Sequence, residues 1–332
     1  TNGLFRLAID RRFSVHGSGI VVTGSVFSGR IKTGDTVSLM PQGIPVKARS
    51  LRTQDQVANE AVAGDRCAIN LTGNRLSLET IHRGNWLTQN PGIASNRIDV
   101  RLEVLQKSPT ALRHWEPIHF HSAANHTTGR VAMLDNRRLE PSEKGLAQVV
   151  LDESINICSG DRFVIRDQAA LITLGGGSVV NPWSVKRGRA KPGRKRFLKL
   201  IQTSSPKRSL AQLIAGNLTG VDLNWFAAAF NLHPDELTDL LAEIPCRSLS
   251  SDYVIDEKHA ASNVANLFVQ LNEWHKANST KPGLPMNQIV DMNRDWPTQL
   301  THQLVHEMLS KGKLNQDGNV FFLEGYRLRL SP

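Results

Sequence analysis

The sequence predicts a multidomain protein: two antiparallel β-barrels followed by two winged-helix (α+β) domains. Three observations indicate this order. Short runs of β-branched and apolar residues, separated by Gly, Asn and Asp, fill the first 182 residues. A run with eight Lys/Arg and no acid follows at residues 186–199. Apolar residues at helical spacing, interrupted by hairpin-like segments, then continue to the end. With 332 residues and 40% apolar content, the chain can bury several cores.

The first barrel is predicted over residues 1–92. Val and Ile supply strand-forming positions, and Ser28-Gly29 and Thr33-Gly34-Asp35 have the composition of tight turns. Because glycine adopts positive φ without steric cost, Gly24, Gly29 and Gly34 are expected to divide the segment into short strands.

The second barrel is predicted over residues 96–182. Residues 97–105 alternate apolar and polar positions with the period of a strand. Further strands are expected at 118–121, 129–134, 146–151, 162–166 and 177–180. Gly175-Gly176-Gly177 matches no phosphate-loop motif and opens no helix, so we expect a tight turn there.

Two winged-helix domains are predicted next, the first with its basic linker over residues 183–257 and the second over 258–332. A segment with helical periodicity precedes the strand-like pair SLSSDYVID. The same order, helices and then a strand pair, occurs a second time and ends in a hairpin around Asp317-Gly318. Pro234 suits the first turn of a helix, and Asp295 is expected to cap a helix over 297–311.

Charge is distributed unevenly. Residues 1–199 carry 29 Lys/Arg and 16 Asp/Glu, whereas residues 200–332 carry 11 and 14. This asymmetry indicates that the N-terminal part meets a polyanion, and a chance distribution of solvated charge is the alternative.

Several classes of protein are excluded or disfavoured. No run approaches the roughly 18 apolar residues of a membrane span, and no charged stretch followed by an apolar block opens the chain. The three cysteines match neither a disulfide framework nor a zinc spacing, which fits a reducing cytoplasm. The chain starts without Met inside a strand-like segment, so we expect a fragment of a longer protein.

Three histidines lie close together in the second barrel. His119 and His121 alternate on one predicted strand, and His126 follows shortly after. Histidine is a common zinc ligand, but no further well-spaced ligand completes a site, so no metal is expected. A buried, hydrogen-bonded role is the alternative for each ring.

Several motifs carry a resemblance to a known family. FSVHGSGIVVTGSVFSGRIKTGDTV resembles the second domain of translational GTPases of the elongation factor Tu group, which holds the aminoacyl end of a tRNA. Together with FRLAIDRRF, PIHFHSAANHTTGRV, GDRFVIRD and LITLGGGSVVNP, it resembles the bacterial selenocysteine-specific elongation factors, the SelB family. The resemblance covers essentially the whole chain and implies two barrels of the translational GTPase type.

The resemblance implies a selenocysteyl (aminoacyl) pocket formed by Asp10, Arg11 and Arg66. A selenol is more acidic than a thiol, so the aminoacyl group is expected to be an anion at neutral pH, unlike serine. Arg11 and Arg66 would bind the selenolate, and Asp10 would take the α-amino group or orient an arginine. On the residues alone, Asp10 and Arg11 are a surface ion pair at a strand end.

The resemblance also implies contacts with RNA. It makes His119, His121, His126 and Arg130 tRNA contact candidates. The bases of the linker either touch tRNA or ribosomal RNA or form a solvated hinge; they are Lys186, Arg187, Arg189, Lys191, Arg194, Lys195 and Arg196.

The would-be recognition helix at 234–243 contains four acids and no Lys or Arg, which predicts a spacer arm, because a phosphate backbone repels such a helix. The sequence has no Walker motif. The resemblance therefore implies that this fragment is no enzyme, that GTP and Mg²⁺ bind an absent N-terminal domain, and that missing C-terminal domains grip an mRNA hairpin.

The predicted function is the tRNA-binding and spacer region of a selenocysteine-specific elongation factor. Such a factor delivers selenocysteinyl-tRNA to the ribosome at recoded UGA codons with GTP, and we expect a cytoplasmic monomer with no membrane partner. The alternatives are another translational GTPase carrying ordinary aminoacyl-tRNA, a winged-helix DNA-binding regulator, and a metal-dependent β-barrel enzyme.

Overall fold

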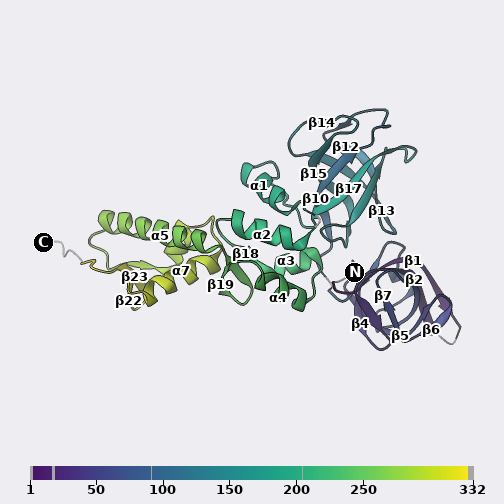
Figure 1. Ribbon diagram of the computed structural model, residues 1–332, viewed down its shortest axis with the longest axis horizontal. Helices are drawn as coiled ribbons and strands as arrows, with labels where there is room; N and C mark the ends of the chain where they lie inside the picture. Colours follow the sequence, from purple (N-terminus) through teal and green to yellow (C-terminus); the bar gives the residue numbers. More distant parts are fainter. Residues whose placement is uncertain (1–2, 17–18, 91, 204, 328–332) are drawn as a thin grey trace. The chain divides into compact units, whose positions relative to one another are not determined.

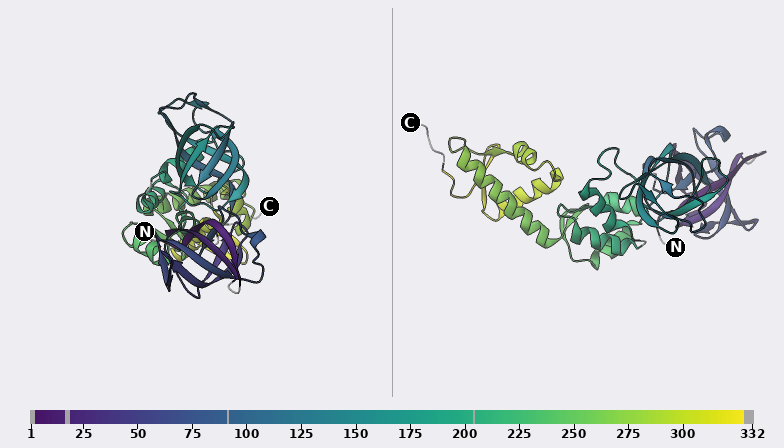
Figure 2. Two further views of the ribbon diagram at one scale, coloured as in Figure 1. Left: turned by 90° about the vertical axis from the view of Figure 1, so that its right-hand side faces the viewer. Right: turned by 90° about the horizontal axis from the view of Figure 1, so that it is seen from above.

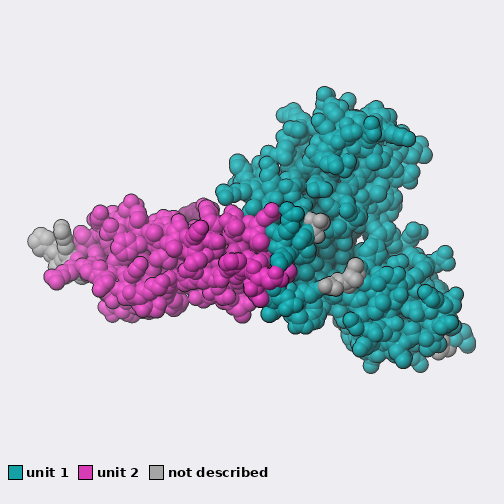
Figure 3. Space-filling view, in the orientation of Figure 1, with its two compact units in different colours: residues 1–209, 227–239 teal, residues 210–226, 240–332 magenta. Residues whose placement is uncertain are grey.

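The computed structural model describes residues 3–16, 19–90, 92–203 and 205–327 (Figure 1). The chain divides into two compact units, coloured separately in Figure 3. Unit 1 comprises residues 1–209 and 227–239, and unit 2 comprises residues 210–226 and 240–332. No helix in the described ranges is long and apolar enough to cross a membrane.

The first barrel is closed by six antiparallel strands in the order β4-β9-β1-β2-β8-β5, with β5 pairing back to β4. These strands are β1 (Arg6–Val15), β2 (Gly19–Ser28), β4 (Thr36–Met40), β5 (Ile44–Thr53), β8 (Arg66–Thr72) and β9 (Trp86–Thr88). The shorter elements are β3 (Arg30–Lys32), β6 (Gln56–Ala58), β7 (Glu60–Val62) and the 3₁₀ turn η1 (Leu78–Thr80). Inward side chains such as Leu7, Ile9 and Ile69 are fully buried and form its core.

The second barrel is also closed by six antiparallel strands, in the order β10-β15-β13-β12-β16-β17. They are β10 (Ser95–Val104), β12 (Glu116–Ser122), β13 (Asn125–Met133), β15 (Lys144–Ile155), β16 (Arg162–Arg166) and β17 (Thr173–Asn181). A small ladder joins β11 (Leu112–Arg113) to β14 (Arg138–Leu139). The prediction of two antiparallel barrels is therefore confirmed.

Two glycine assignments were wrong. β2 runs without a break through Gly24, and Gly175, Gly176 and Gly177 lie inside β17 and form no turn. A Cβ atom on Gly24 would meet the carbonyl oxygen of Ala8 at 2.1 Å. These glycines therefore let neighbouring strands approach closely inside a closed barrel.

The C-terminal part is helical with two small three-stranded sheets. The helices are α1 (Pro192–Ile201), α2 (Pro206–Gly216), α3 (Leu223–Phe230), α4 (Pro234–Ala242), α5 (Glu257–Ala277), α6 (Met286–Met292) and α7 (Thr298–Ser310). One sheet holds β18 (Val221–Asp222), β19 (Arg247–Ser250) and β20 (Tyr253–Ile255), and the other β21 (Leu284–Pro285), β22 (Leu314–Asp317) and β23 (Val320–Leu323).

In unit 2 a single hydrophobic cluster joins both sheets. It extends from Leu249 and Tyr253 in the first sheet to Leu314 and Phe321 in the second. The long helix α5, labelled in Figure 1 and clear in the right-hand view of Figure 2, packs against β23 and α7 over this cluster. The expected cap at Asp295 was wrong, because α7 starts after Pro297 without a side-chain cap.

Candidate functional site

An acidic residue and a basic residue meet on the outer side of the first barrel. The register of β1 against β2 shifts between Ile9 and Arg11, so Asp10 lies at a β-bulge. Asp10 Oδ2 accepts a hydrogen bond from Arg66 Nη1 at 2.5 Å, and Asp10 Oδ1 accepts one from the Thr23 hydroxyl at 2.7 Å. Bulges often redirect a side chain next to a functional site.

Arg66 and Arg11 remain accessible around this bulge. The Arg66 side chain is 57% exposed despite its ion pair. Arg11 is also exposed and directly follows Asp10 on β1. The structure therefore brings Asp10 and Arg66 into contact, whereas Arg11 is linked to them only by its place next to Asp10 on β1. Thr23 was missed at the sequence level, because a threonine in a strand carries no signal of its own.

The three histidines of the second barrel form a stack with His126 in the middle. Its ring centroid lies 5.0 Å from that of His119 and 4.5 Å from that of His121. His119 Nε2 lies 3.1 Å from the carbonyl oxygen of Gln168, which can only accept, so this nitrogen carries the proton. In the neutral ring Nδ1 then accepts from His126 Nε2 at 2.7 Å.

This pattern uses both nitrogens of His119 inside the protein. Within the described ranges, no group of three or more His, Cys, Asp or Glu side chains is arranged to hold a metal ion. Burial lowers the pKa of His121 below its usual value, and electrostatic interactions with His126, Arg166 and His119 lower it further. His121 is therefore neutral at physiological pH.

A buried ion pair joins the two barrels. Arg6 Nη1 and Nη2 donate to the two oxygens of Asp161, at 3.0 and 2.7 Å, and the guanidinium lies 4.3 Å from the centroid of the Trp86 ring. Asp161 also accepts the amide of Cys158. Burial alone would lower the pKa of Arg6, but Asp161 and Cys158 outweigh it and the pKa rises. Arg6 therefore stays charged.

The cysteines are free thiols. Burial raises the pKa of Cys67 to about 12 and that of Cys158 to about 11. Both are protonated at neutral pH, and neither is suited to nucleophilic or metal chemistry.

The basic linker lies against the second barrel over part of its length. Arg194 forms an ion pair with the buried Asp99, and Lys195 pairs with Asp135 at 3.0 Å. Arg189 lies over the Trp115 ring, 5.5 Å from its centroid. These three basic side chains thus make contacts within the protein. The linker residues that are exposed are Lys186, Arg187, Lys191 and Arg196.

Comparisons with known proteins agree with this architecture. Residues 96–186 match the family model of the selenocysteine-specific elongation factor β-barrel domain, and residues 19–88 match that of elongation factor Tu domain 2. The selenocysteine-specific elongation factor of Escherichia coli (strain K12) is 34% identical over 282 residues, covering 84% of this chain and 43% of that protein. The chain is a SelB-like protein.

Two further relatives extend the match over the helical part. The selenocysteine-specific elongation factor of Haemophilus influenzae is 28% identical over 98% of this SelB-like chain and 52% of its own length. A crystal structure of a bacterial selenocysteine-specific elongation factor, EF-Sec, superposes with a TM-score of 0.73 at 20% identity, over 97% of this chain and 50% of that one. The SelB-like chain spans about half the length of the curated relatives it matches.

Proposed function

We propose that this chain is the tRNA-binding and spacer region of an elongation factor that delivers selenocysteinyl-tRNA to the ribosome at recoded UGA codons. The observation that carries the proposal is the group formed by Asp10, Thr23 and Arg66 on the first barrel; Arg11 is the residue that follows Asp10 on β1. The family assignment supports the same function.

The chemistry of this group suits an anionic aminoacyl side chain. Asp10 engages one end of the Arg66 guanidinium, and an arginine carries five N–H donors, so others remain for a ligand. A hydrogen bond to a charged group contributes roughly 1.5–3 kcal/mol, which corresponds to roughly 10- to 150-fold in affinity. A selenolate would gain this interaction, and the neutral serine hydroxyl would gain much less. Asp10 then acts by orienting Arg66.

The test replaces Arg66 or Arg11 by alanine in an elongation factor that contains this chain and a GTP-binding domain. We expect each variant to lose roughly 10-fold or more in affinity for selenocysteinyl-tRNA and little for seryl-tRNA. Filter binding with both charged tRNAs at fixed salt measures the ratio, and Arg49→Ala, at an exposed residue of β5, is the matched control. Equal losses for both tRNAs would refute recognition of the anion.

We further propose that the second barrel contacts the tRNA through Arg130. Its Nη1 donates to the carbonyl of Trp115 at 3.2 Å, and its other donors remain available for a phosphate. His119 holds His126 in place, since both nitrogens of His119 already have partners. His121 and the exposed His126 complete this surface.

GTP chemistry belongs to the parent protein in this proposal. The homologous elongation factors and the match to elongation factor Tu domain 2 support a GTPase parent that binds GTP with Mg²⁺. The parent would act as a monomer in the cytoplasm, and an mRNA hairpin would bind domains beyond those described.

Residues 183–257 and 258–332 are proposed to be two winged-helix modules that act as a spacer arm. Their shared hydrophobic cluster supports a stiff arm. Glu307 adds a polar link, because it accepts from Arg247 at 2.6 Å and from Lys311 at 2.5 Å. Burial would raise the pKa of Glu307, but the hydrogen bonds from Arg247 and Lys311 lower it, so the link stays ionised at neutral pH.

A further inference from the structure

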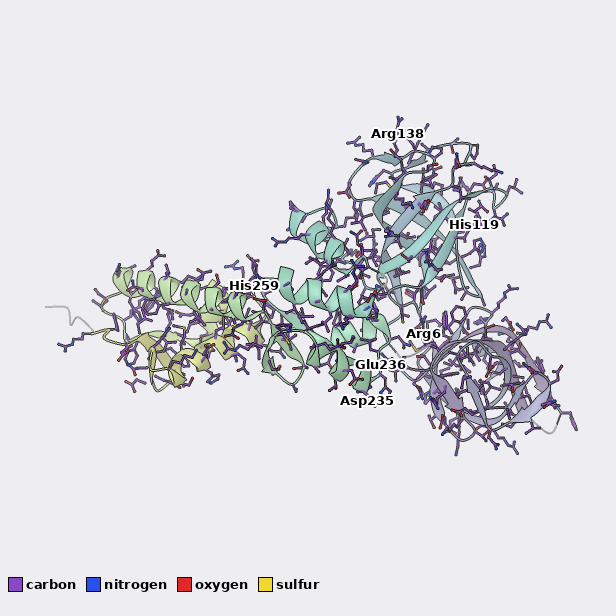
Figure 4. The ribbon with its side chains drawn as sticks, in the orientation of Figure 1. Arg6, His119, Arg138, Asp235, Glu236 and His259 are labelled. Carbon is purple, nitrogen blue, oxygen red and sulfur yellow. The ribbon has the colours of Figure 1, made fainter. Side chains whose placement is uncertain are left out.

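A basic hollow lies at the end of the second barrel where β11 pairs with β14. Its volume is about 740 Å³, and Arg113, His114, Arg137 and Arg138 are among the residues that line it. We call Arg113, Trp115, Arg137, Arg138 and Arg189 the β11–β14 surface. Figure 4 labels Arg138 in this region and His119 elsewhere on the same barrel.

Like charges face one another across this surface. Arg113 and Arg138 are direct partners in the β11–β14 ladder, an arrangement that destabilises a sheet when both residues carry the same charge. Arg138 has a salt bridge to Glu140 at 2.7 Å, yet its side chain is 70% exposed. The side chains of Arg113 and Arg137 are exposed and have no ion-pair or hydrogen-bond partner within the ranges that the structure describes. An anion between these guanidinium groups would relieve the repulsion.

The acid in the hollow does not compensate this charge. Asp135 also lines it, but Asp135 already pairs with Lys195 at 3.0 Å. Lys195, on helix α1, therefore neutralises the carboxylate that lines the hollow. The hollow keeps its excess of positive charge.

Trp115 displays an aromatic ring beside these cations at an energetic cost. Its φ is +70°, a left-handed conformation that is a genuine outlier for a bulky residue. Its backbone amide donates a hydrogen bond to the Val131 carbonyl at 2.6 Å, and the residue is 41% exposed. Arg189 lies over the ring, 5.5 Å from its centroid. Backbone strain that turns a large apolar ring toward solvent is typical of a binding site.

We propose that the β11–β14 surface binds a single-stranded RNA segment, with one base stacked on Trp115 and neighbouring phosphates on Arg113 and Arg137. Unstacked bases bind aromatic and guanidinium faces, whereas a duplex keeps its bases inside. Cations beside an exposed aromatic ring are the combination found in single-strand binding sites.

This surface is distinct from the aminoacyl pocket and from the histidine stack, although Arg130 adjoins it through the hydrogen bond from its Nη1 to the Trp115 carbonyl at 3.2 Å. Trp115 immediately precedes β12, and His121 lies six residues further along that strand, about 20 Å at the rise of an extended chain. The inference thus does not depend on the aminoacyl pocket or on tRNA contacts near His126.

The experiment measures binding of a fluorescein-labelled 12-nucleotide oligo(U) to the whole chain by anisotropy between 50 and 200 mM KCl. We expect Arg113→Ala/Arg137→Ala to weaken binding about 10-fold and to reduce the salt slope by about 1.4, since each phosphate contact contributes about 0.7 for a single strand. The matched control is Arg49→Ala/Arg101→Ala, which removes two exposed arginines from β5 and β10.

Trp115 is tested by a variant that suits its backbone. Asparagine tolerates left-handed φ, so Trp115→Asn removes the ring without new strain. We expect roughly 5- to 100-fold weaker oligo(U) binding, and Trp115→Phe should recover part of it. Circular dichroism confirms that each variant is folded.

Three outcomes would overturn the inference. One is an equal loss in the Arg49/Arg101 control. Another is binding of a 12-base-pair RNA duplex as tight as that of oligo(U) and unchanged by Trp115→Asn, which would indicate a phosphate surface without base stacking. The third is equal competition by poly-glutamate, which would indicate a general polyanion surface. None of these outcomes bears on discrimination between selenocysteinyl- and seryl-tRNA, so the two proposals fail independently.

Discussion

Asp10 depends on its neighbours for its position. The register shift on β1 falls opposite Gly24, which has no side chain to obstruct the strand at that point. Thr23, on the same outer side, then fixes one carboxylate oxygen and leaves the other for Arg66. A serine or alanine at position 24 would push β1 away and disturb this geometry before it touched either charged residue.

At the same scale, His121 predicts a pH dependence of stability. Its pKa in the folded chain is lowered, mainly by burial, from an ordinary value of 6.5. The unfolded chain therefore binds the proton more readily, so stability is present above about pH 6.5 and falls as the pH drops through the folded pKa. We expect the melting temperature to fall between pH 7.5 and 5.5, and the fall to be smaller in His121→Gln.

Differential scanning fluorimetry at several pH values measures this dependence. His16→Gln is the control, because that histidine is exposed on the first barrel. A wild-type protein and a His121→Gln variant with parallel pH curves would contradict the assignment.

At the element scale, the closed second barrel depends on the glycines of β17. A Cβ atom on Gly177 would lie 1.9 Å from the carbonyl oxygen of Arg101 on β10, a clash with backbone that no rotamer relieves. We expect Gly177→Ala to destabilise the chain by about 1–3 kcal/mol or more. Gly193→Ala is the matched control, since nothing lies within 4 Å of its Cβ position in α1, where alanine favours the helix.

Urea unfolding of the two variants measures the difference. If Gly177→Ala unfolded at the same urea concentration as Gly193→Ala, the close approach of β10 and β17 would be wrong.

Most elements could be predicted because their signals are local. The strand at 162–166 and the turn at Asp317-Gly318 follow from alternation and turn chemistry, and the structure has both. The roles of Gly24 and Gly177 could not be predicted, because a turn glycine and a close-packed strand glycine look alike in a sequence. The exposed ring of Trp115 could not be predicted either, because its exposure depends on the left-handed backbone conformation of that residue.

At the scale of the whole chain, long-range pairs were beyond sequence reasoning. Arg6 and Asp161 are 155 positions apart, and nothing local links them. Asp10 and Arg66 were predicted as site residues from the family resemblance, whereas their direct contact is seen only in the folded structure. The linker shows the same limit, because charge alone could not separate Arg194, which pairs with Asp99, from the exposed Arg196.

Arg6→Met tests how strongly the two barrels are joined. Only 5% of the Arg6 side chain and 15% of the Asp161 side chain are exposed, and breaking such a pair leaves a buried charge, at a cost of about 3–5 kcal/mol. The surface pair of Arg30 and Glu60 is more exposed, so Arg30→Ala should cost about 1 kcal/mol or less. Guanidinium unfolding followed by tryptophan fluorescence compares them, and similar costs would exclude a joining role for Arg6.

The acidic helix α4 predicts weak recognition of an mRNA hairpin by this chain. Its residues Asp235 and Glu236, labelled in Figure 4, occupy the first turn. The Glu236 carboxylate accepts hydrogen bonds from the backbone amides of Gly3 and His233. We expect the chain to bind a hairpin no more tightly than a scrambled one of equal length, as measured by gel shift. Sequence-specific binding at nanomolar concentration would contradict the spacer role.

The turn between α3 and α4 has a mechanical consequence. The backbone carbonyl of Asn231 accepts a hydrogen bond from the Leu4 amide, and its side-chain amide donates to the Leu4 carbonyl and to the Ser28 hydroxyl. Tension on α4 would therefore reach Leu4, two residues before β1 begins, without passing along the intervening chain. A displacement of that helix would in this way be transmitted to the segment that leads into β1, the strand that carries Asp10.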